Sequence, residues 1–163
     1  MIKHKKIKSL KLLTQIRKRL AKESKKVVFT NGCFDILHRG HIECLRRAQS
    51  FGDVLMVGLN SDSSVRKLKG KKRPILSQND RAEILASLEM VDYVVIFNEE
   101  TPLKVIASLV PDVLVKGGDY AKDKIVGKDI VESGGGRVIT IKQVAGKSTR
   151  NIIKTIVDRY IKT

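Results

Sequence analysis

The sequence predicts an α/β protein built on a five-stranded parallel sheet with helices on both faces. Two observations support this prediction. Five short apolar runs alternate along the chain with segments of helical periodicity, which is the order that strand–helix–strand units produce. The runs are continuous rather than alternately apolar and polar, as expected for strands that are buried on both faces of a parallel sheet. The length of 163 residues corresponds to one ordinary domain.

The first elements are an amphipathic helix and two strands separated by a second helix. Ser9 is a candidate N-cap for a helix in which leucine and isoleucine recur at three- and four-residue spacing, at Leu10, Leu13, Ile16 and Leu20. Residues 27–30, VVFT, predict the first strand, because this β-branched run ends at an Asn-Gly pair. A helix is predicted from His41 to near Gly52, and residues 54–59 predict the second strand.

The rest of the chain repeats this order after a polar stretch and a basic loop. A helix is predicted from about Asn79 to Met90, since Ser77 and Asp80 resemble a capping box. Thr101 and Pro102 predict another helix, with Thr101 as N-cap and Pro102 at the first helical position. The remaining predicted elements are strands at residues 93–97, 113–115 and 138–141, a short helix near 123–133, and a last helix at 149–161.

Two local segments produce the formal net charge of +16. Residues 1–26 contain eleven lysines and arginines against a single acid, Glu23, and residues 66–73, RKLKGKKR, add six more. We interpret residues 1–26 as a basic N-terminal helix packed on or beside a single domain of residues 27–163. A solvated lysine face explains this helix, and binding to nucleic acid or an anionic surface is the alternative. For residues 66–73, a phosphate-binding loop and a solvated turn both remain open.

Composition narrows the class of protein further. The longest apolar runs are about six residues, whereas a membrane-spanning helix needs about 20, and the N-terminus lacks the apolar core of a secretory signal. We therefore expect a cytoplasmic protein in which Cys33 and Cys44 are free thiols. Aromatic residues make up only 4% of the chain, which disfavours a surface that stacks single-stranded bases.

The strongest candidate for a functional site is TNGCFDILHRGH, residues 30–41. This segment directly follows the first strand, at the sheet edge where parallel α/β proteins bind ligands. Gly32 allows backbone amides to approach phosphate oxygens, and the helix N-terminus near Gly40 supplies further donors. His38 and His41 are three residues apart, so both imidazoles can face one ligand, and a nucleoside triphosphate suits this set. Zinc bound by these histidines and Cys44 is the less favoured alternative, because no fourth ligand lies nearby.

Residues 38–41, HRGH, resemble the His-x-Gly-His signature of the nucleotidyltransferase superfamily, and GCFDILHRGH resembles its cytidylyltransferase-like branch. Over residues 27–156 the chain is similar to the heptose 1-phosphate adenylyltransferases. The motifs that carry this similarity are FTNGCFDILHRGH, VGLNSDSSVRKLKGKKRP, DRAEIL, LVKGGDY and KSTRNIIK. The resemblance implies a Rossmann-like sheet and transfer of AMP from ATP to D-glycero-β-D-manno-heptose 1-phosphate, which gives ADP-heptose and pyrophosphate. It also implies Mg²⁺ held mainly by phosphates and water, with no direct protein ligand.

The resemblance also suggests roles for individual residues. The catalytic candidates, which hold and neutralise the reacting phosphates, are His38, His41, Lys69 and Arg81. The nucleotide-binding candidates are Asn31, Gly32, Cys33, Phe34, Asp35, Gly40, Gly117, Gly118, Asp119, Ser148 and Thr149. The acceptor-binding candidates are Asn60, Asp62, Lys69 and Lys116.

Several of these side chains have a structural alternative. Asp35 and Ser148 suit capping roles, Lys116 suits an exposed surface position, and Asn60 and Asp62 suit a turn. Arg150 departs from the family pattern, because relatives usually have a small hydroxyl residue there. Cys33 is not expected to act as a nucleophile, since direct displacement needs none.

Two other functions remain open. One is a cytidylyltransferase that uses CTP and glycerol 3-phosphate, and the other is a basic nucleic-acid-binding module with a vestigial site. The expected partners are ATP, a sugar 1-phosphate and a separate sugar kinase that supplies it, with a homodimer left open. Membrane binding is not expected, and nucleic acid is disfavoured.

Overall fold

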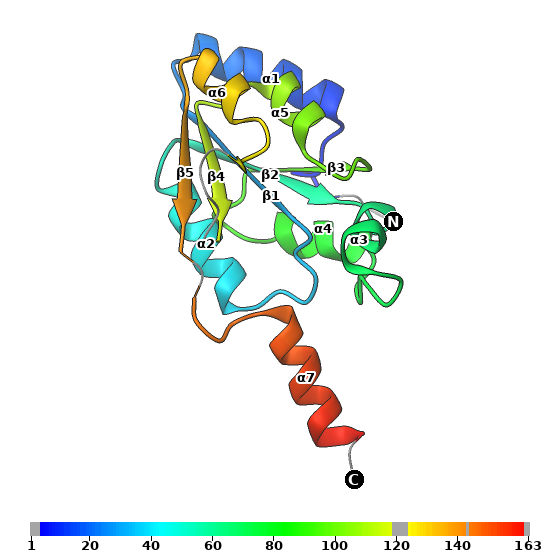
Figure 1. The fold of residues 1–163 in the computed structure, drawn as a ribbon. Helices are drawn as coiled ribbons and strands as arrows, with labels where there is room; N and C mark the ends of the chain where they lie inside the picture. Colours follow the sequence, from blue (N-terminus) through cyan, green and yellow to red (C-terminus); the bar gives the residue numbers. More distant parts are fainter. Residues whose placement is uncertain (1–3, 119–123, 143, 162–163) are drawn as a thin grey trace.

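The computed structural model describes residues 4–118, 124–142 and 144–161 (Figure 1). Its centre is a five-stranded parallel sheet in the order β3-β2-β1-β4-β5. The predicted fold class is therefore confirmed. The strands are β1 (Val27–Gly32), β2 (Val54–Asn60), β3 (Tyr93–Phe97), β4 (Val113–Gly117) and β5 (Arg137–Ile141).

Helices cover both faces of this sheet, and each face has its own apolar cluster. Helices α1 (Leu10–Lys22), α5 (Leu103–Leu109) and α6 (Lys128–Ser133) lie on one face. Helices α2 (Arg39–Gln49) and α4 (Gln78–Ala86) lie on the other, with α3 (Asp62–Lys69) beside α4. Successive strand residues alternate between the two clusters, as the period of a β-strand requires. In Figure 1 helix α7 (Thr149–Tyr160) projects away from the body of the protein.

Helix α1 shares the core of the domain, although its sequence is strongly basic. Leu13 and Leu20 are buried in the cluster that α1 forms with α5 and the sheet. The Arg17 guanidinium donates hydrogen bonds to the Leu109 carbonyl and to the Asp112 carboxylate, so it joins α1 to the segment before β4. The lysines of α1 face solvent. The helix therefore combines a packed apolar face with the solvated lysine face that its composition suggests.

Two local predictions were wrong. The polar and basic stretch after β2 is not a loop throughout, because its first part forms helix α3, with Ser61 as its N-cap. This helix presents Val65 to the core and leaves Leu68 exposed, so its apolar periodicity is too weak to detect in the sequence. Thr101 does not cap α5, since Pro102 occupies the N-cap position and no side chain caps that end.

Other predicted helix ends agree with the structure or shift slightly. The Ser77 hydroxyl accepts a hydrogen bond from the Asp80 amide and caps α4, as predicted, but α4 ends at Ala86 rather than Met90. Helix α2 begins at Arg39, two residues earlier than predicted, because His38 caps it. Among the described residues, no helix is both long and apolar enough to cross a bilayer.

Candidate active site

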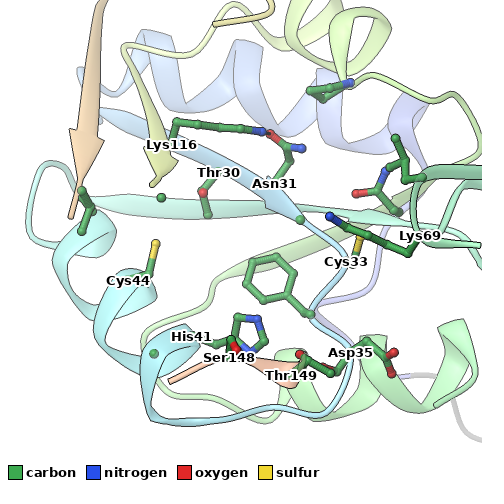
Figure 2. Close-up of a pocket in the computed structure, with 18 of the residues that line it drawn as sticks. Thr30, Asn31, Cys33, Asp35, His41, Cys44, Lys69, Lys116, Ser148 and Thr149 are labelled. Atoms are coloured by element: carbon green, nitrogen blue, oxygen red, sulfur yellow. Dashed lines mark hydrogen bonds between the residues drawn. The ribbon is translucent and has the colours of Figure 1, made fainter. Parts of the chain in front are cut away.

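A cavity of about 570 Å³ opens at the carboxyl ends of the strands. The loop from β1 to α2, the ends of β2 and β4, the end of α3 and the start of α7 all contribute to its wall. Figure 2 shows Lys116, Asn31 and Lys69 across the opening from His41 and Ser148. The predicted site residues that line it are Asn31, Gly32, Cys33, Phe34, Asp35, His38, Gly40, His41, Asn60, Lys69, Lys116, Gly117, Ser148 and Thr149.

Four predicted site residues do not fall among these. Asp62 and Arg81 lie behind the wall of the cavity, where they form an ion pair. Gly118 does not line the cavity either, and its amide donates a hydrogen bond to the Ile141 carbonyl. Asp119 lies outside the described residues. The structure thus brings most of the candidates together from segments that are far apart in the chain.

The imidazoles of His38 and His41 form a stacked pair within this wall. Their ring centroids are 3.8 Å apart, with an interplanar angle of 23°. His38 is the N-cap of α2, and its Nδ1 accepts a hydrogen bond from the Gly40 amide at 3.1 Å. Because Nδ1 accepts this bond, the neutral ring of His38 has its proton on Nε2. His38 therefore has one ring atom committed to the helix and one available as a donor.

The His41 ring is packed into the wall, but one of its nitrogen atoms has no hydrogen-bond partner among the described residues. Its Nδ1 is buried and has no partner among the described residues, and the Phe34 ring packs against it with a centroid distance of 5.2 Å. Burial lowers the pKa of His41 to about 4, and the neighbouring His38 adds to the shift. His41 is therefore neutral at pH 7. An unpartnered buried polar atom costs free energy, which a hydrogen-bonding ligand would recover.

The loop that precedes the histidines has an unusual backbone. Phe34 and Ile36 have φ angles of 45° and 54°, in the left-handed region that side chains disfavour. Asp35 lies between them and holds the loop in place, because its carboxylate accepts hydrogen bonds from the Ile75 and Leu76 amides and pairs with Arg73. Strained backbone of this kind persists only where surrounding contacts determine it.

The Asp35 carboxylate is therefore committed to the protein rather than to a ligand. Burial opposes its ionisation, but the amides of Leu76 and Ile75 and the Arg73 guanidinium outweigh this and hold the pKa of Asp35 below its ordinary value. Its backbone carbonyl accepts a hydrogen bond from the Thr149 hydroxyl at 2.6 Å. This bond joins the β1–α2 loop to the start of α7, so Asp35 has the anchoring role that its sequence left open.

The N-terminus of α7 forms another part of the wall. Ser148 is its N-cap and accepts a hydrogen bond from the Asn151 amide. A Cβ atom on Gly40 would lie 3.1 Å from the Lys147 carbonyl oxygen, so glycine at this position allows α2 and the α7 approach to come close together. Two helix N-termini therefore lie beside the same cavity, and helix N-termini favour anions.

Lysines bring positive charge to both sides of the cavity. Lys69, at the end of α3, is exposed at the opening, whereas Lys116 on β4 is partly buried. The Lys116 ammonium donates a hydrogen bond to the Asn31 side chain at 3.1 Å, and burial lowers its pKa. Further cations that were not candidates from the sequence also line the cavity: Arg73, Lys124, Lys142 and Lys147. The sequence could have indicated Lys147 as a site residue, since it directly precedes the candidates Ser148 and Thr149.

Arg81 supports the wall from behind rather than facing the cavity. Its side chain is 1% exposed, and its guanidinium donates to the carbonyls of Leu76, Cys33 and Asn60 and to the Asp62 carboxylate. Cys33 and Asn60 themselves line the cavity. Arg81 therefore connects the ends of β1 and β2 with the starts of α3 and α4. In this geometry both Arg81 and Asp62 are framework residues.

The fold and site together define a class of protein. A parallel α/β sheet with a cationic cavity at its carboxyl ends, bordered by helix N-termini, is the arrangement of Rossmann-like nucleotide-binding proteins. Within this class, the chain belongs to the cytidylyltransferase-like family, whose sequence profile matches residues 29–160. This membership confirms the resemblance that the HRGH segment and its flanking residues indicate.

Curated relatives provide a closer comparison. The chain is 55% identical over 155 residues to the bifunctional protein HldE of Citrifermentans bemidjiense, and 57% identical over 155 residues to the protein of that name from Geobacter metallireducens. Each alignment covers 95% of this chain and 32% of the relative. The chain thus spans about a third of the length of these relatives.

Solved structures agree with the fold. The lipopolysaccharide core biosynthesis protein from Thermoplasma volcanium has a TM-score of 0.61 and 28% identity, over 74% of this chain and 97% of that one. Pantoate-beta-alanine ligase from Francisella tularensis has a TM-score of 0.62 over 96% of this chain and 79% of that one. At 16% identity the second comparison shows the fold alone.

Proposed function

We propose that this chain is an adenylyltransferase that moves AMP from ATP to D-glycero-β-D-manno-heptose 1-phosphate, giving ADP-heptose and pyrophosphate. The observation that carries the proposal is the stacked His38–His41 pair in a cationic cavity beside two helix N-termini, where the Nδ1 of His41 has no partner among the described residues. The choice of acceptor rests on the motifs that resemble heptose 1-phosphate adenylyltransferases and on the identity with the HldE proteins. The related T. volcanium structure is described as a lipopolysaccharide core biosynthesis protein.

The proposed reaction is a direct displacement at the α-phosphorus of ATP. An oxygen of the acceptor phosphate forms a bond to this phosphorus while the bond to the bridging oxygen of pyrophosphate breaks. No covalent intermediate on the protein is needed, so the site requires positioning and charge neutralisation rather than a nucleophile. Cys33 agrees with this requirement, because burial raises the pKa of its thiol and so disfavours the reactive thiolate.

The side chains of the cavity divide this work. His38 donates from Nε2, and His41 donates from the ring nitrogen that carries its proton, toward the charge that develops between the α-phosphate and the leaving pyrophosphate. The Ser148 hydroxyl and the backbone amides at the α7 N-terminus, that of Thr149 included, receive the terminal phosphates, because the Thr149 hydroxyl already donates to the Asp35 carbonyl. Lys69 neutralises the phosphate of the acceptor, which enters from the side of α3.

Mg²⁺ supplies charge neutralisation on the terminal phosphates when it is bound with ATP. Among the described residues, no three His, Cys, Asp or Glu side chains gather into a metal site. Asp35 is part of the cavity wall, but its carboxylate already binds Arg73 and two backbone amides. This donor set fits a Mg²⁺ that phosphate oxygens and water hold, as Mg²⁺ commonly is in phosphate sites.

The setting of the reaction follows from its substrates. ATP and a phosphorylated sugar are both cytoplasmic metabolites, so we place the enzyme in the cytoplasm. The acceptor needs a kinase that phosphorylates the anomeric hydroxyl of the heptose. A homodimer is compatible with the proposal but is not needed for it.

A panel of pyrophosphate-release assays tests the proposal. ATP and CTP are each combined with heptose 1-phosphate, glycerol 3-phosphate and hexose phosphates. We expect turnover with ATP and heptose 1-phosphate and none with CTP and glycerol 3-phosphate. Activity with CTP and glycerol 3-phosphate alone would instead identify a cytidylyltransferase. Absence of pyrophosphate from every pair, together with salt-sensitive binding of polynucleotides, would favour the basic nucleic-acid-binding module.

A further inference from the structure

We propose that Glu100, in the loop between β3 and α5, selects the acceptor by receiving hydrogen bonds from its sugar hydroxyl groups. This inference deepens the proposed function and rests on it. Glu100 is exposed and lines the cavity together with Thr101 and Pro102. None of these three residues was predicted from the sequence to belong to the functional site.

Glu100 differs from the other carboxylates of the cavity in having no partner among the described residues. Three carboxylates line the cavity within the described residues, those of Asp35, Glu43 and Glu100. Asp35 is bound to Arg73, and Glu43 pairs with Arg46 at 3.2 Å. No hydrogen bond or ion pair involves the Glu100 side chain within the described part of the chain. Its oxygens are therefore available to a ligand.

The chemistry of a carboxylate in this cavity restricts what that ligand group is. The surrounding charges are positive, from Lys69, Arg73, Lys116, Lys124, Lys142, Lys147 and Arg150, and they suit phosphates. A carboxylate repels phosphates, so it does not belong beside the polyphosphate. It accepts strong hydrogen bonds from neutral donors. A sugar 1-phosphate carries such donors, since its hydroxyl groups lie on the ring away from its phosphate.

The position of Glu100 next to the sheet is closer to the proposed acceptor contacts than to the proposed nucleotide contacts. Glu100 follows β3, which is the edge strand opposite β5 in the order β3-β2-β1-β4-β5. The proposed nucleotide contacts follow β1, β4 and β5. Of the three acceptor candidates that line the cavity, Asn60 and Lys69 come from β2 and α3, and β2 is the direct neighbour of β3, whereas Lys116 comes from β4. Glu100 is thus on the same side of the site as Asn60 and Lys69.

A buried polar network connects the Glu100 loop to the other acceptor contacts. The Asn60 side-chain amide donates to the Ser64 hydroxyl at 2.9 Å, and this hydroxyl donates to the Glu99 carbonyl at 2.7 Å. Ser64 is fully buried and Asn60 nearly so. Ser64 belongs to α3, which ends at Lys69. These hydrogen bonds therefore fix the position of α3, and with it Lys69, relative to the loop that carries Glu100. Lys69 then meets the phosphate of the acceptor while Glu100 meets its hydroxyl groups.

The neighbouring Glu99 supplies a matched control. It is also an exposed glutamate of the same loop, but it does not line the cavity. Its carboxylate pairs instead with Lys104 at 3.3 Å. The substitutions Glu100→Gln and Glu99→Gln therefore remove the same charge from adjacent positions, and only the first removes it from the cavity.

The experiment compares these two variants with the wild type. For Glu100→Gln, we expect kcat/KM for heptose 1-phosphate to fall about 10- to 100-fold, the range for lost hydrogen bonds to a charged group. The Kd for ATP and the Mg²⁺ concentration required should stay unchanged. With ethyl phosphate, an acceptor without sugar hydroxyls, the variant and the wild type should be equal. Glu99→Gln should resemble the wild type in every assay.

Three results would overturn the inference. Equal kinetics of Glu100→Gln and Glu99→Gln with the sugar phosphate would show that Glu100 does not contact the acceptor. An equally large loss of ATP affinity, or a higher requirement for Mg²⁺, would assign Glu100 to the nucleotide or its metal. Wild-type enzyme that turns over no sugar 1-phosphate would overturn the proposed function as well, so the two failures are distinguishable.

Discussion

Replacing Arg81 by lysine should destabilise the fold, because the buried guanidinium serves four acceptors at once. These acceptors are the carbonyls of Leu76, Cys33 and Asn60 and the carboxylate of Asp62. Lysine keeps the charge but concentrates its three donors on one atom, which cannot reach four acceptors on three separate segments. At least one buried acceptor then loses its partner, and the ion pair to Asp62 is weakened.

The size of the effect follows from these contacts. A buried acceptor left without its partner costs about 1–3 kcal/mol, and breaking a buried ion pair costs about 3–5 kcal/mol. We therefore expect Arg81→Lys to lower the free energy of unfolding by about 3 kcal/mol, measured by urea denaturation. Arg66→Lys on the exposed side of α3 is the control, and it should stay within about 0.5 kcal/mol of the wild type.

The same measurement can refute the framework role. If Arg81→Lys changes the free energy of unfolding by less than about 1 kcal/mol and still abolishes turnover with ATP, Arg81 contacts the reacting phosphates directly. Its side chain would then have to leave the buried position that the structure shows.

The remaining predictions concern the histidine pair, Cys33 and helix α1. His41→Ala should lower the single-turnover rate at least about 100-fold, as for loss of an oxyanion donor, and a near-normal rate would exclude its role. The wild type should lose stability as the pH falls from 6.5 toward 4, because the unfolded chain protonates His41 at its ordinary pKa of 6.5 whereas the folded protein does so only at about 4. Urea titrations of wild type and His41→Gln at pH 7 and pH 5 should show a smaller loss for the variant, and equal losses would contradict the low pKa of His41. Cys33→Ala should retain turnover, since no step uses the thiol, and a folded variant that binds ATP without turnover would refute direct displacement. Leu13→Ala should lower the free energy of unfolding by about 2–5 kcal/mol, and an unchanged urea midpoint would show that α1 packs only loosely on the domain.

The sequence predicted the sheet well because its signals are local. Each strand is a short apolar run bounded by polar or glycine residues, and the alternation with helices determines a parallel arrangement. The β1–α2 loop was equally visible, since HRGH and its glycines stand together in the chain. These features depend on neighbouring residues, which a single sequence displays directly.

The rest of the site depends on contacts between distant segments, which one sequence does not display. The pairing of Asp35 with Arg73 and the burial of Arg81 arise only when β1, β2 and α4 come together. An arginine beside a candidate phosphate-binding motif looks like a phosphate ligand until its acceptors are known. Glu100 gave no signal at all, since a glutamate in a polar loop is ordinary until the loop is seen to border a cavity. Helix α3 was missed because little of it is buried.

The proposed reaction requires that the stacked imidazoles receive the triphosphate of ATP. The most direct test is a crystal structure of the protein with Mg²⁺ and an ATP analogue that cannot be cleaved between the α- and β-phosphates. We predict phosphate oxygens within hydrogen-bonding distance of His38 and His41, with the terminal phosphates at Ser148 and Thr149. An analogue bound elsewhere, or with its phosphates turned away from both histidines, would contradict the account.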